Sequence, residues 1–444
     1  MYALLKKMVV KVLVMEARGV LARYKPSVIA ITGSVGKTTT KDAVHAALSG
    51  HVYARRSVKS YNGELGVALT ILGLENAWGS ALGWAFNIVM GLILLARKRR
   101  YPQWLIIEVG ADRPGDIRRI AKWLRPDIVV LTGISDIPAH VEFFDSPEHV
   151  LKEKRALADN LKAGGKLILN GDDARVQRLK ADFRGASMTY GFAPENNFFA
   201  THDEISYETR RTNAGDATIS RPSGVHFRAN HAGSSIPVSV AGALGAPRVY
   251  AGLAAIAVAD AVGIDSVSAA QALARWVPPP GRVRILDGMK DSTIIDDTYN
   301  SSPAAALAAL DTLKIVQCLP AGGRRIAVIG DMLELGKYAK DAHRKVGERA
   351  AACADKLITI GIRARQVADA ALDAGMRDAD ILQYDIGERD RAADELALDL
   401  KAGDVVLVKG SQAMRLERFV LGIMAEPLKA SDLLVRMEPE WEMR

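Results

Sequence analysis

Short apolar runs alternate with stretches of helical periodicity along most of the chain. Between residues 28 and 277 this alternation predicts a mostly parallel sheet whose strands are connected by helices. The predicted strands are Val28–Ile31, Trp104–Val109, Asp127–Leu131 and Lys166–Leu169. Residues 198–240 contain Thr, Ser, Gly and Pro and few helix signals, so we expect an antiparallel or irregular excursion there.

The same pattern resumes after Pro278-Pro279-Pro280-Gly281. Prolines stiffen the backbone and remove amide donors, which is typical of a linker. The predicted strands beyond it are Ile294–Asp297, Ile326–Gly330, Lys356–Ile360 and Val405–Val408. The sequence therefore predicts an α/β protein with a central domain at 28–281 and a C-terminal α/β domain at 282–444.

The N-terminal segment, residues 1–27, has a helical pattern of its own. Its apolar residues recur at helical spacing with lysines between them: Leu4, Leu5, Met8, Val9, Val12 and Leu13. The lysines interrupt the apolar run that a signal peptide would need. We expect an amphipathic helix, which could equally pack on its own domain or lie on a membrane surface.

Residues 77–96 carry no charge and are followed by Arg97-Lys98-Arg99-Arg100. Twenty such residues could just span a bilayer. A single span, however, would place Lys37 and the later motifs on opposite sides of the membrane. We therefore favour a helix in the membrane interface, anchored by Trp78, Trp84 and the basic cluster. A buried helical hairpin or an oligomer contact is the alternative.

Composition adds two constraints. The only two cysteines, Cys318 and Cys353, lack partners at metal-ligand spacing, so a disulfide or zinc framework is not indicated and a reducing, cytoplasmic setting fits. The formal charge of +8 over 444 residues suits anionic substrates or an anionic membrane surface and does not specify nucleic acid. The oligomeric state is left open.

Residues 28–41 carry the strongest chemical signal. A buried strand is followed by Thr32-Gly33-Ser34-Val35-Gly36-Lys37-Thr38-Thr39 and then by a helical stretch. In this arrangement backbone N–H groups and the helix dipole face an anion, the lysine reaches the outer phosphates, and the threonine hydroxyl binds Mg²⁺. The glycine spacing is one residue shorter than in the general motif. A chance Gly-rich turn is the alternative.

Three further residues are weaker signals when taken alone. Glu108 ends a predicted strand, where a carboxylate beside a phosphate loop suits Mg²⁺, although it could equally cap the next helix. A lone histidine such as His140 is more often structural. Lys154 lies in a charged helical stretch and could belong to a solvated face.

Taken together and in order, these motifs resemble the Mur ligase family, the ATP-dependent amide ligases of peptidoglycan synthesis. The resemblance runs from about Ile29 to Arg418, and Gly330–Gly336 with His343 favours the branch that adds D-alanyl-D-alanine. It implies a phosphate-loop ATPase domain with a mostly parallel sheet, followed by a Rossmann-like C-terminal domain. The supporting motifs are Thr32–Lys41, Tyr61–Gly66, Glu108–Ala111, Ala139–Phe144, Asn170–Asp173, Ile295–Asn300, Gly330–Gly336 and Lys409–Ser411.

The resemblance also implies residue roles. ATP would bind through Thr32, Gly33, Ser34, Gly36, Lys37, Thr38, Thr39, Asn170, Arg282, Asp296 and Asp297. Two Mg²⁺ ions would be held by Thr38, Glu108, His140 and Lys154, the last carbamylated by CO₂. Asn300, Lys409 and Ser411 would meet the substrates, which are a cell-wall peptide precursor and an amino acid or dipeptide such as D-alanyl-D-alanine. The substrate carboxylate would be activated as an acyl phosphate.

Two features depart from the family pattern. Only about 27 residues precede the first strand, too few for the family's N-terminal UDP-sugar domain. Pro247-Arg248-Val249-Tyr250-Ala251 stands where many members have His-Asn-x-x-Asn. We expect a lipid-linked acceptor presented at the inner face of the membrane, with peripheral contact through 1–25 and 77–100. A ligase that makes another peptide or polyamide and a nucleotide-binding scaffold without ligation are the alternatives.

Overall fold

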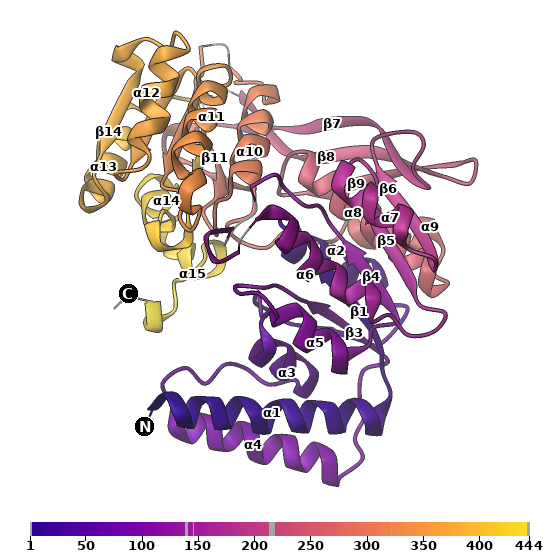
Figure 1. The fold of residues 1–444 in the computed structure, drawn as a ribbon. Coiled ribbons are helices and arrows are strands. Elements are labelled where there is room, and N and C mark those ends of the chain that lie inside the picture. The colour runs from indigo at the N-terminus through magenta and orange to yellow at the C-terminus, as the bar shows by residue number, and fades with distance from the viewer. Residues whose placement is uncertain (1, 138–140, 145, 213–217, 321, 442–444) are drawn as a thin grey trace.

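The computed structural model describes residues 2–137, 141–144, 146–212, 218–320 and 322–441, and it contains two sheets (Figure 1). The first sheet has nine strands, and its first six, in spatial order, are parallel. They are β2 (Ala54–Arg56), β3 (Trp104–Glu108), β1 (Ser27–Thr32), β4 (Ile128–Leu131), β5 (Lys166–Asn170) and β6 (Ala186–Gly191). The α/β prediction and the four predicted strands are confirmed.

Alternate residues of β1 pack in two different hydrophobic cores, because successive side chains of a strand point to opposite faces of the sheet. Ile29 and Ile31 pack with α2 (Lys37–Leu48), α8 (Ala246–Val262) and α9 (Ser266–Leu273). Val28 and Ala30 pack on the other face. The helices there are α1 (Tyr2–Tyr24), α3 (Glu64–Leu72), α5 (Asp116–Leu124), α6 (Pro147–Asp159) and α7 (Ala174–Asp182).

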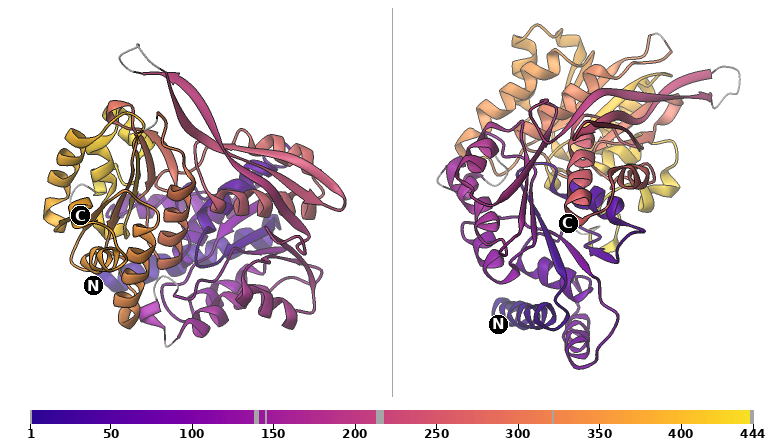
Figure 2. Two further views of the ribbon diagram at one scale, coloured as in Figure 1. Left: turned by 90° about the horizontal axis from the view of Figure 1, so that it is seen from above. Right: turned by 90° about the vertical axis from the view of Figure 1, so that its right-hand side faces the viewer.

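The excursion predicted at 198–240 extends this sheet: its first strand pairs parallel to β6, and the next two strands follow antiparallel. It contains β7 (Phe198–Arg211), β8 (Thr218–His231) and β9 (Ser234–Ala241). The long β7–β8 hairpin reaches the second sheet (Figure 2). Arg210 and Arg221 both pair with Asp287, and the Gln317 amide donates to the Tyr207 hydroxyl at 2.8 Å.

The second sheet has six strands and lies in the C-terminal half. In spatial order they are β10 (Arg284–Asp287), β11 (Thr293–Asp297), β15 (Val405–Lys409), β12 (Arg325–Gly330), β13 (Lys356–Ile360) and β14 (Ile381–Tyr384). Only β10 is antiparallel to its neighbour. One face is covered by α10 (Pro303–Ile315), α11 (Ala339–Ala351) and α12 (Arg365–Asp373). The other is covered by α13 (Arg389–Asp399), α14 (Glu417–Ile423) and α15 (Ala430–Leu433). The exact domain boundaries stay a prediction.

The uncharged segment forms α4 (Ala81–Ala96), which lies along α1 at the base of Figure 1. Helix α1 packs in turn on α3, so α4 is the outer member of the pair. Among the described residues no helix is both long enough and apolar enough to cross a membrane.

Glu16 of α1 is buried against α4, and neither carboxylate oxygen has a hydrogen-bond partner among the described residues. Burial raises the pKa of Glu16 from 4.5 to about 7. The folded protein therefore binds this proton more tightly than the unfolded chain, and stability falls as pH rises from the unfolded pKa toward the folded one.

We expect the melting temperature to fall between about pH 5 and about pH 8, and Glu16→Gln to remove most of this fall. At the upper pH the variant should gain roughly 1–3 kcal/mol in free energy of unfolding. Thermal melts across this pH range measure the effect. Glu348→Gln, at an exposed glutamate of α11, is the control. An unchanged pH profile in Glu16→Gln would contradict the prediction.

Candidate active site

The loop after β1 is built to approach an anion closely. Gly36 has a φ of 83° and precedes α2, so the helix begins at Lys37 with free N–H groups directed into the loop. Gly33 also has a positive φ, and a Cβ there would collide with the Thr132 hydroxyl. The Ser34 amide donates to the Gly133 carbonyl at 2.7 Å. Both glycines are therefore required by the backbone.

Two lysines converge on one carbonyl of this loop. Lys37 and Lys154 donate to the Gly33 oxygen at 2.9 and 3.0 Å. Burial lowers the pKa of Lys37, and burial together with the Lys37 charge holds the pKa of Lys154 well below its usual value. An anion in the loop would relieve this repulsion, whereas a neutral Lys154 amine would be a nucleophile.

Oxygen atoms gather on the other side of Lys37. The Thr38 hydroxyl lies 2.9 Å from Glu108 Oε2 and 2.8 Å from the Ser60 hydroxyl. The Asn62 amide donates to Glu108 Oε1 at 3.3 Å. A buried carboxylate beside two hydroxyls is a ligand set that Mg²⁺ accepts, so the residues fit the ion. The described residues hold no group of three or more His, Cys, Asp or Glu side chains placed to bind a metal.

The C-terminal half completes the site. Arg282 donates to the Thr38 hydroxyl at 3.2 Å and lies 3.9 Å from the centre of the Tyr299 ring. A cavity of about 580 Å³ lies between the phosphate loop and the segment 299–302. Residues separated by some 240 positions in sequence therefore line one space.

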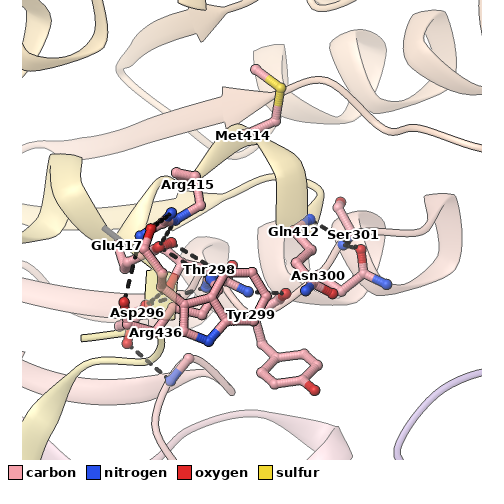
Figure 3. A network of polar contacts seen from close by, with 12 residues as sticks. Asp296, Thr298, Tyr299, Asn300, Ser301, Gln412, Met414, Arg415, Glu417 and Arg436 are labelled. Carbon is pink, nitrogen blue, oxygen red and sulfur yellow. Dashed lines mark hydrogen bonds and ion pairs between the residues drawn. The ribbon is translucent and has the colours of Figure 1, made fainter. Parts of the chain in front are cut away.

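A buried ion-pair network fixes the segment that carries Tyr299 (Figure 3). Arg436 donates to the carbonyls of Thr298 and Tyr299 at 2.7 and 2.9 Å, and it pairs with Glu417 at 2.7 Å. Arg415 pairs with the same glutamate. These contacts hold Tyr299 and Asn300 at the cavity without using any cavity-facing group.

The residues expected to bind nucleotide, metal and substrate divide into three groups. Nine line the cavity: Gly33, Ser34, Gly36, Lys37, Thr38, Glu108, Lys154, Arg282 and Asn300. Seven are buried and do not line it: Thr32, Thr39, Asn170, Asp296, Asp297, Lys409 and Ser411. His140 lies outside the described residues.

The second group supports the loops around the cavity. Lys409 pairs with Asp297 at 2.6 Å and donates to the Asn300 carbonyl at 2.9 Å. Asp296 accepts from the Gly281 amide at 2.9 Å, and burial raises its pKa to about 6. The Asn170 amide donates to the Thr132 carbonyl at 2.9 Å. The roles expected for these residues stay predictions.

Several lining residues received no role from the sequence, among them Ser60, Asn62, Arg113, Tyr299 and Glu334. Asn62, Tyr299 and Glu334 lie within motifs of the family resemblance, which could have indicated them. Nothing local in the sequence marks Arg113.

Comparisons with known proteins agree with this architecture. Fold and site define a nucleotide-binding protein of the phosphate-loop class. A family model described as the Mur ligase middle domain matches residues 31–259, and one described as the Mur ligase, glutamate ligase domain matches residues 281–412. The first match covers more than half of the chain, and the chain belongs to the Mur ligase family.

Similar curated proteins carry the name UDP-N-acetylmuramoyl-tripeptide–D-alanyl-D-alanine ligase. The one from Bacillus subtilis is 26% identical over 413 residues, 93% of this chain and 79% of the relative. The one from Synechocystis is 29% identical over 339 residues, 76% of this chain and 62% of the relative.

Solved structures show the same fold. MurF from Acinetobacter baumannii has a TM-score of 0.73 at 22% identity, covering 91% of this chain and 78% of that one. MurF from Thermotoga maritima, solved in complex with ADP, has a TM-score of 0.71 at 24% identity, covering 93% and 82%.

Arg248, in the segment that departs from the family pattern, is a buried cation close to this site. Its side chain is 1% exposed, and its three guanidinium nitrogens find no hydrogen-bond partner among the described residues. Burial lowers its pKa to about 9, against the opposing effect of Asp297, while the charge of Arg282 lowers it further. The guanidinium lies 5.4 Å from the centre of the Trp276 ring and within electrostatic reach of Arg282, so it adds positive potential near the cavity at a cost in stability.

We expect Arg248→Met to raise the free energy of unfolding by about 1–4 kcal/mol, because it removes an unpaired buried charge at similar volume. We expect phosphate release from ATP to fall at least about tenfold, because the site loses positive potential. Thermal melts and a phosphate assay measure the two effects. Arg275→Met, at an exposed arginine, is the control. A lower melting temperature would instead assign Arg248 to structural support.

Proposed function

We propose that this protein is an ATP-dependent acid–amino-acid ligase of cell-wall precursor synthesis. It joins the carboxylate of a muramoyl-peptide precursor to an amine such as D-alanyl-D-alanine and releases ADP and phosphate. One observation carries the proposal. A phosphate loop with two converging lysines, a carboxylate–hydroxyl pair and an arginine from the second sheet all reach one cavity. The names of the relatives supply the substrates.

The geometry supports phosphoryl transfer. In this proposal the loop amides and Lys37 would bind the β- and γ-phosphates, and Thr38 and Glu108 would hold Mg²⁺, which neutralises phosphate charge when bound. A carboxylate oxygen of the acceptor attacks the γ-phosphorus and breaks its bond to the bridging oxygen, giving ADP and an acyl phosphate. The amine then attacks the acyl carbon, phosphate leaves, and the amine loses a proton.

The second half of the molecule protects the acyl phosphate. Arg282 and Tyr299 come from the C-terminal half and line the same cavity as Lys37, which they would help to close. Water that entered there would hydrolyse the activated carboxylate, so closure favours amide formation over ATP wastage.

Lys154 is the proposed site of carbamylation. Burial and the charge of Lys37 lower the pKa of Lys154, which favours its neutral amine, and this amine can add to CO₂ with loss of one proton. The carbamate would convert the repulsive Lys37–Lys154 pair into an attractive one. It would also add an anionic ligand for the second Mg²⁺ expected at His140.

Other parts of the proposal concern organisation and setting. We assign residues 1–27 to an N-terminal helix, 28–281 to the ATP-binding domain and 282–444 to the C-terminal domain. The ligase works in the cytoplasm, where its two cysteines stay reduced. The membrane contact expected through 1–25 and 77–100 lies on another face of the molecule and is independent of this chemistry.

The test is phosphate release from ATP with Mg²⁺ and bicarbonate across a panel of donors and acceptors. The panel includes D-alanyl-D-alanine, UDP-muramoyl-tripeptide and its lipid-linked form. Release that requires both a donor and an acceptor supports the ligase. A response only to other amines or acids identifies a different peptide or polyamide product. ATP binding without release for any pair, with folded protein, would overturn the proposal in favour of a scaffold.

A further inference from the structure

Helix α4 buries polar and small residues and exposes apolar ones, the opposite of a surface helix in a soluble domain. Its polar and small positions, Asn87 and Gly91, are the buried ones. Four of its large apolar side chains are exposed, Leu82 by 85%, Phe86 by 60%, Val89 by 51% and Leu92 by 54%. Four others, Trp84, Ile88, Leu94 and Leu95, are partly buried against the core. A surface helix ordinarily buries its apolar stripe, so this face requires an apolar partner.

Specific contacts hold α4 in the orientation that exposes these apolar side chains. Gly91 lies against the Glu16 carboxylate so closely that a Cβ would collide with it. The Asn87 amide donates to the Glu75 carbonyl at 2.9 Å, and the Tyr24 hydroxyl donates to the Leu94 carbonyl at 3.0 Å. Two of these contacts are made by the buried residues Asn87 and Gly91 of α4. Rotating the helix to bury Leu82 and Phe86 would break all of them.

Helix α1 extends the same outer layer. It lies beside α4, and its Met8 and Met15 are exposed (Figure 1). Lys6, Lys7 and Lys11 are exposed along it. The two helices therefore present apolar side chains interleaved with cations, the composition typical of helices that lie in a membrane interface.

Charge is concentrated on this helix pair. Residues 1–25 and 77–100 contain ten lysines and arginines and a single acidic residue, Glu16, which is buried. They carry a formal +9 in a chain whose total is +8, so the remaining residues sum to −1. The run Arg97–Arg100 is exposed throughout and directly follows the apolar helix.

We propose that the outer face of α1 and α4, with the basic run Arg97–Arg100, docks the protein peripherally on an anionic lipid bilayer. The apolar stripe enters the boundary between headgroups and acyl chains, and the cations pair with lipid phosphates. A second copy fits poorly, because two faces of this charge repel one another. The inference stands independently of the ligase activity.

Vesicle co-sedimentation of the full chain tests the proposal. We expect binding to vesicles of phosphatidylcholine mixed with phosphatidylglycerol, and at least about tenfold weaker binding to phosphatidylcholine alone. Leu82→Glu/Phe86→Glu should weaken binding to the anionic vesicles at least about tenfold, because each carboxylate would have to enter the acyl boundary. Both side chains are exposed, so the variant keeps its fold.

The matched control is Ile362→Glu/Leu398→Glu in the C-terminal half, where the side chains are 75% and 80% exposed. It should bind like the wild type. Replacing Arg97–Arg100 by glutamine should remove the preference for anionic lipid. No vesicle binding by the wild type would overturn the proposal. So would lipid-free dimers that Leu82→Glu/Phe86→Glu converts to monomers, because the occupant would then be a second copy.

Discussion

We expect Lys37→Met to lower phosphate release from ATP by at least about 100- to 1,000-fold while the protein remains folded. Lys37 opens α2 and donates to the Gly33 carbonyl, the position from which it would turn to the outer phosphates. The variant therefore loses the stabilisation of the negative charge that develops during phosphoryl transfer.

Stability separates this effect from unfolding. Burial lowers the pKa of Lys37, so its charge costs energy in the nucleotide-free protein, and methionine should leave the melting temperature equal or higher. ATP should raise the melting temperature of the wild type and not that of the variant. Lys122→Met, at an exposed lysine of α5, should behave as wild type. If Lys37→Met kept its activity, the proposed role of the phosphate loop in the reaction would be wrong.

The second large effect is expected at Lys154, where alanine should lower turnover at least about 100-fold. If the lysine acts as a carbamate, wild-type activity should also fall when CO₂ and bicarbonate are removed, and short carboxylic acids should partly restore Lys154→Ala. Carbon-13 NMR with labelled bicarbonate would detect the carbamate directly. The lowered pKa supports this chemistry, because only the neutral amine reacts with CO₂.

Lys152→Ala is the matched control, because this lysine is exposed on the same helix, α6. It should retain full activity with and without bicarbonate. Activity of the wild type that is independent of CO₂, with loss in Lys154→Ala that no carboxylic acid restores, would assign Lys154 a different role. It would then act as a second cation toward phosphate.

The sequence predicts those parts of the site whose geometry is local. The phosphate loop is contiguous, and its glycines are dictated by a turn of a few residues, so Gly33, Gly36 and Lys37 could be placed without a structure. The central parallel strands of both sheets, such as β1, β4, β12 and β15, are marked by apolar runs, because both of their faces are buried.

The remaining features depend on segments that are distant in sequence. Arg282 meets Thr38 only because the second sheet packs over the first, and the Lys409–Asp297 pair depends on the alignment of β11 with β15. The orientation of α4 could be read only in part. The small and polar residues Asn87 and Gly91 can be seen in the sequence, whereas their burial depends on contacts with Glu75 and Glu16.

The β7–β8 hairpin constrains how the two halves can move. If the two halves were joined only by the chain near Gly281, they could rotate relative to one another in any direction. Arg210 and Arg221 of the hairpin pair with Asp287 of β10, and this contact attaches the first sheet to the second at another point. Other contacts join the halves beside the cavity, among them Arg282 with Thr38 and Lys59 with Glu438. A rotation about the line through Gly281 and Asp287 would keep the hairpin contact, separate Arg282 from Thr38 and open the cavity on the side of Tyr299.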